Sequence, residues 1–519
     1  MEKVDILVIG GGMAGLMAAL SAKAGDKEVL LISKHPIGRS GNTLVSGGGI
    51  AGATEKDENT AEAFIEDILK SGKGLAKQEL VEMLANRSAE MIKRLSDFGV
   101  GLIREGENLR FRKPPGHSVA RNIPTRWKGL SYLNRGLSFT LPLLSQCQKQ
   151  EIRMVEGWEA VQLVKKAGRV IGAVFQSLKG EHRIIYAGNI ILATGGAGSL
   201  FERTNNTFDI QGGGLALALQ VGCTLQDMEQ IQFYPTMMFE PLKMTVSNPL
   251  FGVGAVLRNK DGERFMSKYD AAGDLATRDN MARGIFLEIQ AGNGVDGTVY
   301  FDCTGIPEAT LQTSYSDFCS FLAKKNINPS KNYLRIAPCA HYTLGGVVMD
   351  AKCQTEVPGL LVAGEICGGI HGANRLSGVA LMEACVTGWQ AGETAVKTMI
   401  APVIEDEFPM IFESSLSKSM LIRVRQILWE KASLMRNQKG LEEALDEVME
   451  MQECLSKANE FVSNFLKIAE VILRSALFRQ ESRGAHYRSD FFEKDSFYDG
   501  NIVCRLKENQ LTLELKPLD

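Results

Sequence analysis

The stretch VDILVIGGGMAG (residues 4–15) decides the fold class of this chain. Residues 4–10 are a short apolar run that ends in glycine, which is typical of a buried parallel strand. Gly10, Gly12 and Gly15 then give the spacing G-x-G-x-x-G at the start of a helical pattern. The first glycine permits a tight turn, the second lets the backbone approach a pyrophosphate, and the third allows close helix–strand packing. The stretch therefore predicts a β-α-β unit that binds a dinucleotide.

A second apolar run, EVLLIS (28–33), completes this unit. An acidic residue near the end of that strand, about 20 residues after the first glycine, usually hydrogen-bonds the ribose of NAD. Here Ser33 and Lys34 stand at the strand end, and neither is acidic. The sequence therefore disfavours an ordinary NAD site but permits FAD, because neutral groups and backbone can hold its adenosine.

The elements of this cofactor-binding core are divided along the chain. Strand patterns at 182–196 and at GLLVAGE (359–365) are of the same kind as the first. The residues between them are mixed in pattern, and those after about 405 have helical periodicity. The fold class predicted is α/β, and the predicted divisions are a Rossmann-like cofactor domain at 1–232 and 344–404, an α+β capping domain at 233–343, a helical bundle at 405–495 and a C-terminal tail with a hairpin at 496–519.

Bulk composition narrows the function classes. The chain is 45% apolar and 23% charged with a formal net charge of −3, so we expect a globular protein that binds no nucleic acid. The ten cysteines show no metal- or cluster-binding spacing, which predicts no metal centre within the chain and favours a reducing, cytoplasmic location. No apolar run approaches the roughly 20 residues that span a bilayer, and the strand at Val4 leaves no room for a signal peptide. We therefore expect no direct membrane insertion, and any membrane association to be made through a partner.

Ten segments of the chain together resemble one flavoprotein family. They are VIGGGMAG (8–15), RSGNTLVSGGGIAGA (39–53), GHSVAR (116–121), ATGGAG (193–198), DMEQIQFYPT (227–236), TRDNMARGI (277–285), HYTLGGV (341–347), GLLVAGE (359–365), HGANRLSG (371–378) and ESRGAHYRSD (481–490). In their order and spacing the chain resembles the flavoprotein subunits of succinate dehydrogenase and fumarate reductase, a family that includes L-aspartate oxidase. The resemblance runs from the first strand almost to the C-terminus.

The resemblance implies an FAD domain that is split by a capping domain and followed by a helical domain, in agreement with the divisions above. It implies that FAD contacts Gly10, Gly12, Met13, Ala14, Gly15, Ser33, Lys34, Asn42, Thr43, Gly47, Gly48, Gly49, Ala193, Thr194, Gly195, Tyr342, Gly364, Glu365, Arg375, Gly378 and Leu381. Asn42 takes the position of the histidine that is joined covalently to the flavin in many membrane-bound members. We therefore expect non-covalent FAD.

The family interconverts a C–C single bond and an alkene beside a carboxylate, so the resemblance implies an oxidoreductase that acts on the CH–CH bond of a small carboxylate. Arg278 matches the residue that exchanges the proton, while His341 and Arg375 match the clamp for the substrate carboxylate. Arginine suits a clamp because its planar guanidinium can make two parallel hydrogen bonds to a carboxylate. It can serve as an acid only if a relay replaces its proton at once, because its pKa lies above about 12.

The chain departs from the family where the far carboxylate of a C4 dicarboxylate binds. The family motif QFHPT reads QFYPT here, so Tyr234, neutral near pH 7, replaces a histidine among the predicted catalytic residues. The Thr-Glu pair of the family's capping domain aligns with Ser247 and Asn248. We therefore expect a substrate whose far end differs from that of fumarate.

Three functions remain open on the sequence alone. The first is a reductase or dehydrogenase of an unsaturated and saturated carboxylate pair, acting as the flavoprotein subunit of an electron-transfer complex. Because the chain has no cluster or haem motif, its electrons would pass through an iron–sulfur subunit or another carrier. The second is an L-aspartate oxidase-like amino-acid oxidase, which would form peroxide with aspartate. The third is a catalytically silent flavin-binding or assembly subunit, whose reduced flavin no alkene acid would reoxidise.

Overall fold

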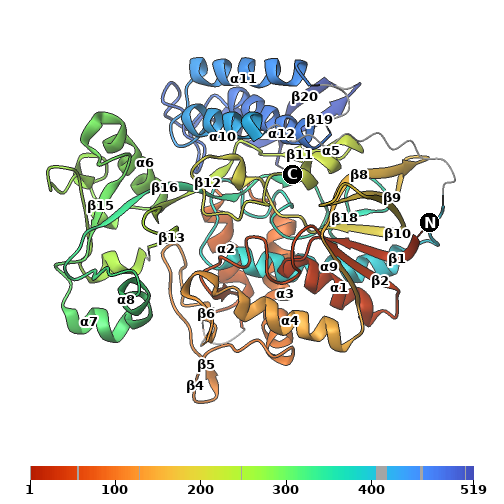
Figure 1. Cartoon of the computed structure of the whole chain (residues 1–519), viewed down its shortest axis with the longest axis horizontal. Helices are drawn as coiled ribbons and strands as arrows, with labels where there is room; N and C mark the ends of the chain where they lie inside the picture. Colours follow the sequence, from red (N-terminus) through yellow and green to blue (C-terminus); the bar gives the residue numbers. More distant parts are fainter. Residues whose placement is uncertain are drawn as a thin grey trace.

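The computed structural model describes residues 2–54, 58–127, 129–246, 248–404, 418–455, 460–508 and 510–518. Figure 1 shows an α/β body, a green lobe that projects to one side of it, and a blue layer of helices along its edge. The lobe is built from the residues of the predicted capping domain, and the blue layer from residues near the C-terminus.

A mostly parallel sheet forms the centre of the body. Its strands are β7 (Arg153–Glu156), β2 (Val29–Ser33), β1 (Glu2–Ile9), β10 (His182–Leu192), β9 (Arg169–Ser177) and β8 (Trp158–Lys166), with β18 (Leu360–Val362) also pairing with β10. The pairs β7–β2, β2–β1, β1–β10 and β10–β18 are parallel, whereas β10–β9 and β9–β8 are antiparallel. Since β18 follows the capping lobe in the chain, segments from both sides of the insertion build one sheet, and the predicted Rossmann-like fold class is confirmed.

Two helices packed against each other cover this sheet near the cofactor-binding glycines (Figure 1). They are α1 (Met13–Ala24) and α9 (Val379–Thr398). A Cβ added at Gly388 would lie 2.4 Å from Ala14 O, and one at Gly392 would lie 2.6 Å from Ala18 O. The two backbones therefore approach so closely that only glycine fits at these α9 positions. This contact brings the N-termini of both helices to one side of the sheet.

The remaining helices of the body surround this core. They are α2 (Ala61–Ser71), α3 (Gln78–Asp97), α4 (Leu137–Lys149) and α5 (Gly213–Gln220). Short strands β3 (Gly49–Ala51) and β6 (Asn122–Pro124) pair with each other, as do β4 (Arg104–Glu105) and β5 (Asn108–Leu109). None of the helices within the described ranges combines the length and the apolar composition needed to cross a bilayer.

The capping lobe has its own sheet and its own hydrophobic core. The sheet order is β13 (Met244–Thr245), β12 (Ile231–Met238), β16 (Leu334–Thr343), β15 (Val299–Asp302) and β14 (Val256–Arg258). The helices are α6 (Arg278–Glu288), α7 (Glu308–Ser314) and α8 (Ser316–Ala323). Strands β12 and β16 run from the body into the lobe, and α6 packs on both of them. Three predicted site residues consequently share this junction: Tyr234 on β12, His341 on β16 and Arg278 at the start of α6.

The C-terminal layer contains α10 (Lys418–Ala432), α11 (Gln438–Glu453) and α12 (Glu460–Phe478). The hairpin of β19 (Gly500–Lys507) and β20 (Gln510–Pro517) follows them. Strand β19 also pairs with β11 (Leu225–Gln226), which in turn pairs with β17 (Gly346–Val347), so the tail is tied into the body. Residues 405–417, at the start of the predicted helical bundle, lie outside the described residues, as does Ser247.

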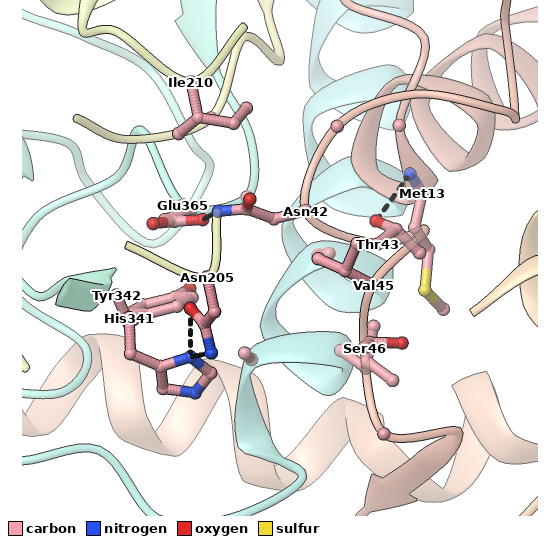
Figure 2. A pocket seen from close by; sticks show the side chains of 18 of the residues that line it. Met13, Asn42, Thr43, Val45, Ser46, Asn205, Ile210, His341, Tyr342 and Glu365 are labelled. Atoms are coloured by element: carbon pink, nitrogen blue, oxygen red, sulfur yellow. Dashed lines mark hydrogen bonds between the residues drawn. The ribbon is translucent and has the colours of Figure 1, made fainter. Parts of the chain in front are cut away.

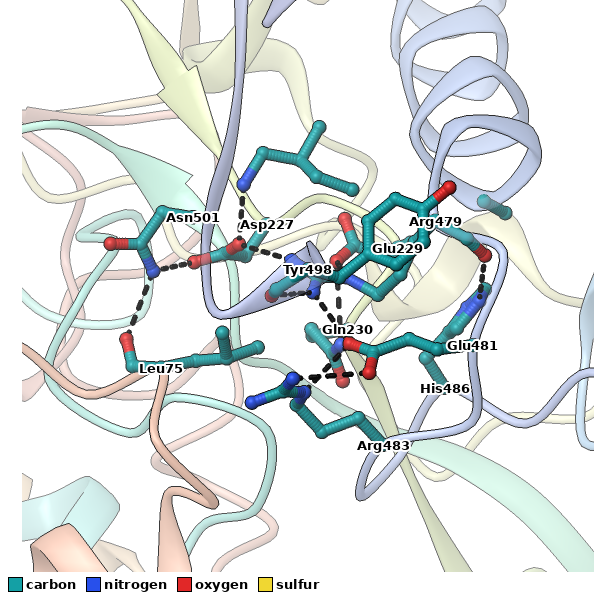
Figure 3. Close-up of polar contacts among 12 residues, drawn as sticks. Leu75, Asp227, Glu229, Gln230, Arg479, Glu481, Arg483, His486, Tyr498 and Asn501 are labelled. Carbon is teal, nitrogen blue, oxygen red and sulfur yellow. Dashed lines mark hydrogen bonds and ion pairs between the residues drawn. The ribbon is translucent and has the colours of Figure 1, made fainter. Parts of the chain in front are cut away.

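A buried ionic cluster joins the end of α12 to the body (Figure 3). The fully buried guanidinium of Arg479 donates to Glu229 at 2.7 Å, to Glu481 at 2.9 Å and to Asp227 at 3.3 Å. Arg483 also donates to Glu481, at 2.7 Å. Because these charges compensate one another in a region screened from solvent, the cluster is sensitive to the loss of any one member.

Candidate active site

One cavity of about 850 Å³ lies between the α/β body and the capping lobe. Every predicted catalytic and cofactor-binding residue except Gly15 lines it. Gly15 lies beneath the cavity floor, where an added Cβ would be 1.8 Å from Gly10 O. Its role is therefore the close packing that the third glycine of the motif provides. The structure brings together residues that stand up to 371 positions apart in the sequence.

The cavity has the features that a dinucleotide requires. Three helices, α1, α5 and α9, direct their N-termini into it, with Gly12, Gly212 and Gly378 as their N-cap residues. None of these caps has a side chain that satisfies the first backbone N–H groups. Free N–H groups and the positive end of the helix dipole bind phosphate and other anionic groups. A Cβ at Gly47 would meet no atom within 4 Å, so this lining leaves open space for a ligand.

The cavity wall beside Lys34 contains an acidic residue that sequence reasoning missed. Glu159 on β8 lines the cavity and pairs with Lys34 at 2.8 Å. In an NAD-binding unit an acidic residue usually stands at the position of Lys34. Here the carboxylate beside that position belongs to Glu159, which lies on a strand distant in the chain. No local pattern around Glu159 could have indicated this, because the contact depends on how β8 crosses the sheet.

Asn42 is held by a polar network at the wall of the cavity (Figure 2). Its side-chain amide donates to Glu365 at 2.8 Å and to Asn206 at 2.6 Å. Glu365 also accepts from the backbone N–H of Thr343 at 3.1 Å, while burial raises the pKa of its carboxyl to about 7. The Asn42 amide thus orients neighbouring groups and offers no ring nitrogen for a covalent bond to a flavin.

His341 and Arg375 are in direct contact at the other end of the cavity. Nη2 of Arg375 donates to Nε2 of His341 at 2.8 Å, and Nη1 donates to the carbonyl of Leu376 at 3.0 Å. A guanidinium has donors only, so Nε2 of His341 must be the acceptor and the ring proton must sit on Nδ1. That proton is donated to Oδ1 of Asn205 at 3.1 Å (Figure 2). Asn205 is thus a second site residue that the sequence did not indicate.

This tautomer changes the expected role of His341. The sequence led us to expect that its ring donates to a substrate carboxylate, but in the structure its cavity-facing nitrogen accepts from Arg375. Burial lowers the pKa of His341 well below 6.5, and the charges of Arg375 and Arg278 lower it further. The ring is therefore neutral near pH 7 and accepts a hydrogen bond from the guanidinium.

The substitution Asn205→Asp should raise the pKa of His341. A carboxylate at this position would accept a hydrogen bond from Nδ1–H and stabilise the doubly protonated ring. That ring could not accept a hydrogen bond from Arg375. Titration of the ring nitrogens by NMR in histidine-labelled protein measures this pKa directly. We expect a higher ring pKa in the variant than in the wild type. An unchanged titration would show that Asn205 does not control the ring.

Tyr234 and Arg278 lie beside this pair. The Tyr234 ring is 5.4 Å from the His341 ring, and the Arg278 guanidinium carbon is 5.7 Å from the Tyr234 ring. The Tyr234 hydroxyl donates to the carbonyl of Val246 at 3.0 Å, and burial raises the pKa of this phenol. Tyr234 is accordingly neutral. Its hydroxyl proton is donated to a backbone carbonyl and does not point into the cavity.

Comparisons with known proteins agree with this architecture. The family described as "FAD binding domain" matches residues 5–381, and the family described as "Fumarate reductase flavoprotein C-term" matches residues 422–519. An uncharacterized FAD-dependent oxidoreductase from Methanocaldococcus jannaschii is 33% identical, over 98% of this chain and 97% of its own. A chain named as one subunit of the fumarate reductase (CoM/CoB) of Methanothermobacter marburgensis is 31% identical, over 97% of each chain.

An L-aspartate oxidase from Vibrio cholerae is 30% identical over 94% of this chain and 96% of its own. Among solved structures, Mycobacterium smegmatis Sdh1 in complex with UQ1 has a TM-score of 0.87 and 27% identity, covering all of this chain and 95% of that one. These matches confirm the predicted family, fold and FAD cofactor. The chain therefore belongs to the family of fumarate reductase and succinate dehydrogenase flavoproteins, and it is an FAD-dependent oxidoreductase.

Proposed function

We propose that this flavoprotein interconverts an unsaturated and a saturated carboxylate, with Arg375 holding the substrate carboxylate and Arg278 exchanging the proton. When bound, FAD supplies hydride exchange at its N5 position. In the reductive direction the alkene gains that hydride at one carbon and a proton at its neighbour, and the oxidative direction reverses both transfers. The relative named as part of a fumarate reductase supports this reaction class.

The observation that carries the proposal is the unpaired charge of Arg375. Its side chain is buried, and no carboxylate of the described residues lies within ion-pair distance of it. Its Nε atom is buried without any hydrogen-bond partner. A buried cation without a counter-ion is costly, so this guanidinium is prepared for an anion that arrives with the substrate.

Arg278 is positioned to act on a substrate held in this way. It is half-buried at the cavity edge, and its charge acts on both His341 and Arg375. Because a guanidinium keeps its proton strongly, transfer requires an immediate replacement from solvent or an acidic neighbour such as Asp279. Closure of the capping lobe would exclude water from the reacting carbons while leaving Arg278 near the rim.

We also propose that the chain acts as the flavoprotein subunit of an electron-transfer complex. The relative from Methanothermobacter marburgensis is named as one subunit of a larger enzyme, which supports this assignment. An iron–sulfur protein or another carrier would then exchange electrons with the flavin, and that partner would make any contact with a membrane. Non-covalent binding of FAD is part of the same proposal, since Asn42 is engaged with Glu365 and Asn206.

A second candidate function is oxidation of L-aspartate. It is favoured by relatives named L-aspartate oxidase that match at 30–32% identity over 94% of this chain. Both functions require a carboxylate clamp, so Arg375 alone does not distinguish them. The two functions differ in the amino group of the substrate and in the final electron acceptor.

Anaerobic reoxidation of the chemically reduced holoenzyme tests the leading proposal. Monocarboxylic and dicarboxylic 2-enoates are added one at a time, and the flavin absorbance spectrum is followed. We expect at least one enoate to restore the oxidised spectrum. If none does and aerobic L-aspartate instead produces peroxide, the second function is correct. If neither substrate class changes the flavin, the chain is catalytically silent.

A further inference from the structure

The capping side of the cavity carries an excess of positive charge. Arg112, Lys113, Arg135 and Arg278 line it there. The carboxylate on this side, Asp274, is occupied: it pairs with Arg264 at 2.8 Å and accepts from the backbone of Leu257 at 3.0 Å. This end of the cavity is therefore prepared for a second negative group, separate from the one that Arg375 would hold.

Arg135 occupies a fixed position within this set. It precedes Gly136, whose N–H donates to Leu44 O at 3.2 Å and whose added Cβ would lie 1.6 Å from Thr43 O. Only glycine permits this approach, so the backbone of Arg135 is pressed against the loop that is predicted to contact FAD. A Cβ at Gly48, in the same loop, would be 3.3 Å from Cβ of Arg135.

The side chain of Arg135 reaches from that loop toward the capping lobe. Its guanidinium carbon lies 4.1 Å from the centre of the Tyr132 ring. Tyr132 in turn packs on Phe321 and Phe318 of α8, with ring centres 5.4 and 6.2 Å away. This stacking holds the planar guanidinium in one orientation, which reduces the entropy lost when it binds a planar carboxylate.

The guanidinium interacts with the neutral Tyr132 side chain but has no anionic partner among the described residues. Its Nε atom is buried and has no hydrogen-bond acceptor, and no carboxylate of the described residues forms an ion pair with Arg135. Tyr234, near it in the cavity, cannot act as a counter-ion, because burial raises the pKa of its phenol and keeps it neutral. The charge of Arg135 reaches Tyr234: it opposes the rise that burial causes in the pKa of that phenol.

We propose that Arg135 binds the second anionic group of a dicarboxylate, at the end of the substrate opposite Arg375. This inference rests on the proposed function, since it names the substrate class of the same site. It assigns selectivity for a second anionic group to an arginine, because Tyr234 is neutral and donates its hydroxyl proton to Val246. The site would thus prefer a dianionic enoate to a monoanionic one of similar length.

The test compares matched ligands on FAD-loaded wild type and Arg135→Gln. Succinate and butyrate, which cannot accept hydride, are titrated on the chemically reduced enzyme while the flavin spectrum is followed, and fumarate and 2-butenoate are compared as substrates. We expect Arg135→Gln to weaken succinate about 10- to 100-fold, the loss of one hydrogen-bonded charge pair, and to change butyrate less than about 3-fold. Arg135→Lys should keep part of the preference, because it retains the charge.

Arg112→Gln is the matched control, because Arg112 is exposed on the same cavity edge. It should weaken both ligands only slightly, with the larger effect on the dianion, and only at low salt. Equal effects of Arg135→Gln on succinate and butyrate, or a wild type that binds them equally, would overturn the inference. Binding of succinate in preference to butyrate without any enoate turnover would instead refute the proposed function and leave the assignment of Arg135 standing.

Discussion

Arg278→Ala should lower turnover of the enoate substrate by about 1000-fold while the FAD content of the protein stays unchanged. The loss is large because the residue is proposed to exchange the proton in the rate-limiting chemistry. FAD content is preserved because the cradle is made by α1, α9 and the glycine loops, whereas Arg278 is the first residue of α6 in the capping lobe. Stopped-flow measurement of flavin reoxidation, together with the flavin-to-protein ratio, checks both parts.

Arg283→Ala provides the control for this substitution. Arg283 lies on the same helix, five residues further on, but does not line the cavity and instead lies over the Tyr487 ring at 4.9 Å. It should leave the flavin reoxidation rate within about 3-fold of the wild type, since it cannot reach the substrate. Turnover by Arg278→Ala at a rate close to that of the control would remove Arg278 from the mechanism.

The parts of the site that sequence predicts well are those with local signals. Gly10, Gly12 and Gly15 lie within six residues, and each has a separate steric reason to be glycine. The role expected of Arg375 comes instead from the family resemblance of HGANRLSG (371–378), and it stays a prediction. The parallel sheet follows from short apolar runs, whose burial in β1 and β2 is almost complete. Such features depend on neighbouring residues in the chain, so they can be predicted from the sequence without a structure.

The parts that sequence does not predict depend on contacts between distant segments. The His341 ring contacts Asn205 across 136 positions of the chain, and Glu159 pairs with Lys34 from a distant strand. Arg135 lies in a segment with no recognisable motif, and its significance appears only because Gly136 presses it against the cofactor loop. The committed proton of Tyr234 likewise depends on β12 lying beside Val246. The direction of a hydrogen bond depends on how donor and acceptor are arranged in the folded structure, and residue type alone does not determine it.

Arg479→Ala should be strongly destabilising, lowering the local free energy of opening by about 3–5 kcal/mol. Three carboxylates, those of Asp227, Glu229 and Glu481, share this guanidinium, and all of them are buried. Removing the cation leaves Glu229 and Asp227 without their guanidinium partner in a region that excludes water, while Glu481 keeps Arg483. The end of α12 and the β19 hairpin should then detach from the body together.

Amide hydrogen exchange at Ile502 reports this opening directly, because its N–H donates to Asp227 Oδ1 at 3.0 Å. Arg423→Ala is the control: Arg423 pairs with Glu447 on the surface of the same helical layer, where such a pair contributes less than about 1 kcal/mol. Exchange at Ile502 should accelerate strongly in Arg479→Ala and hardly at all in Arg423→Ala. If both variants exchanged at the wild-type rate, the cluster would not be what holds the C-terminal layer against the body. The attachment would then have to come from the β11–β19 pairing and the apolar contacts of α12.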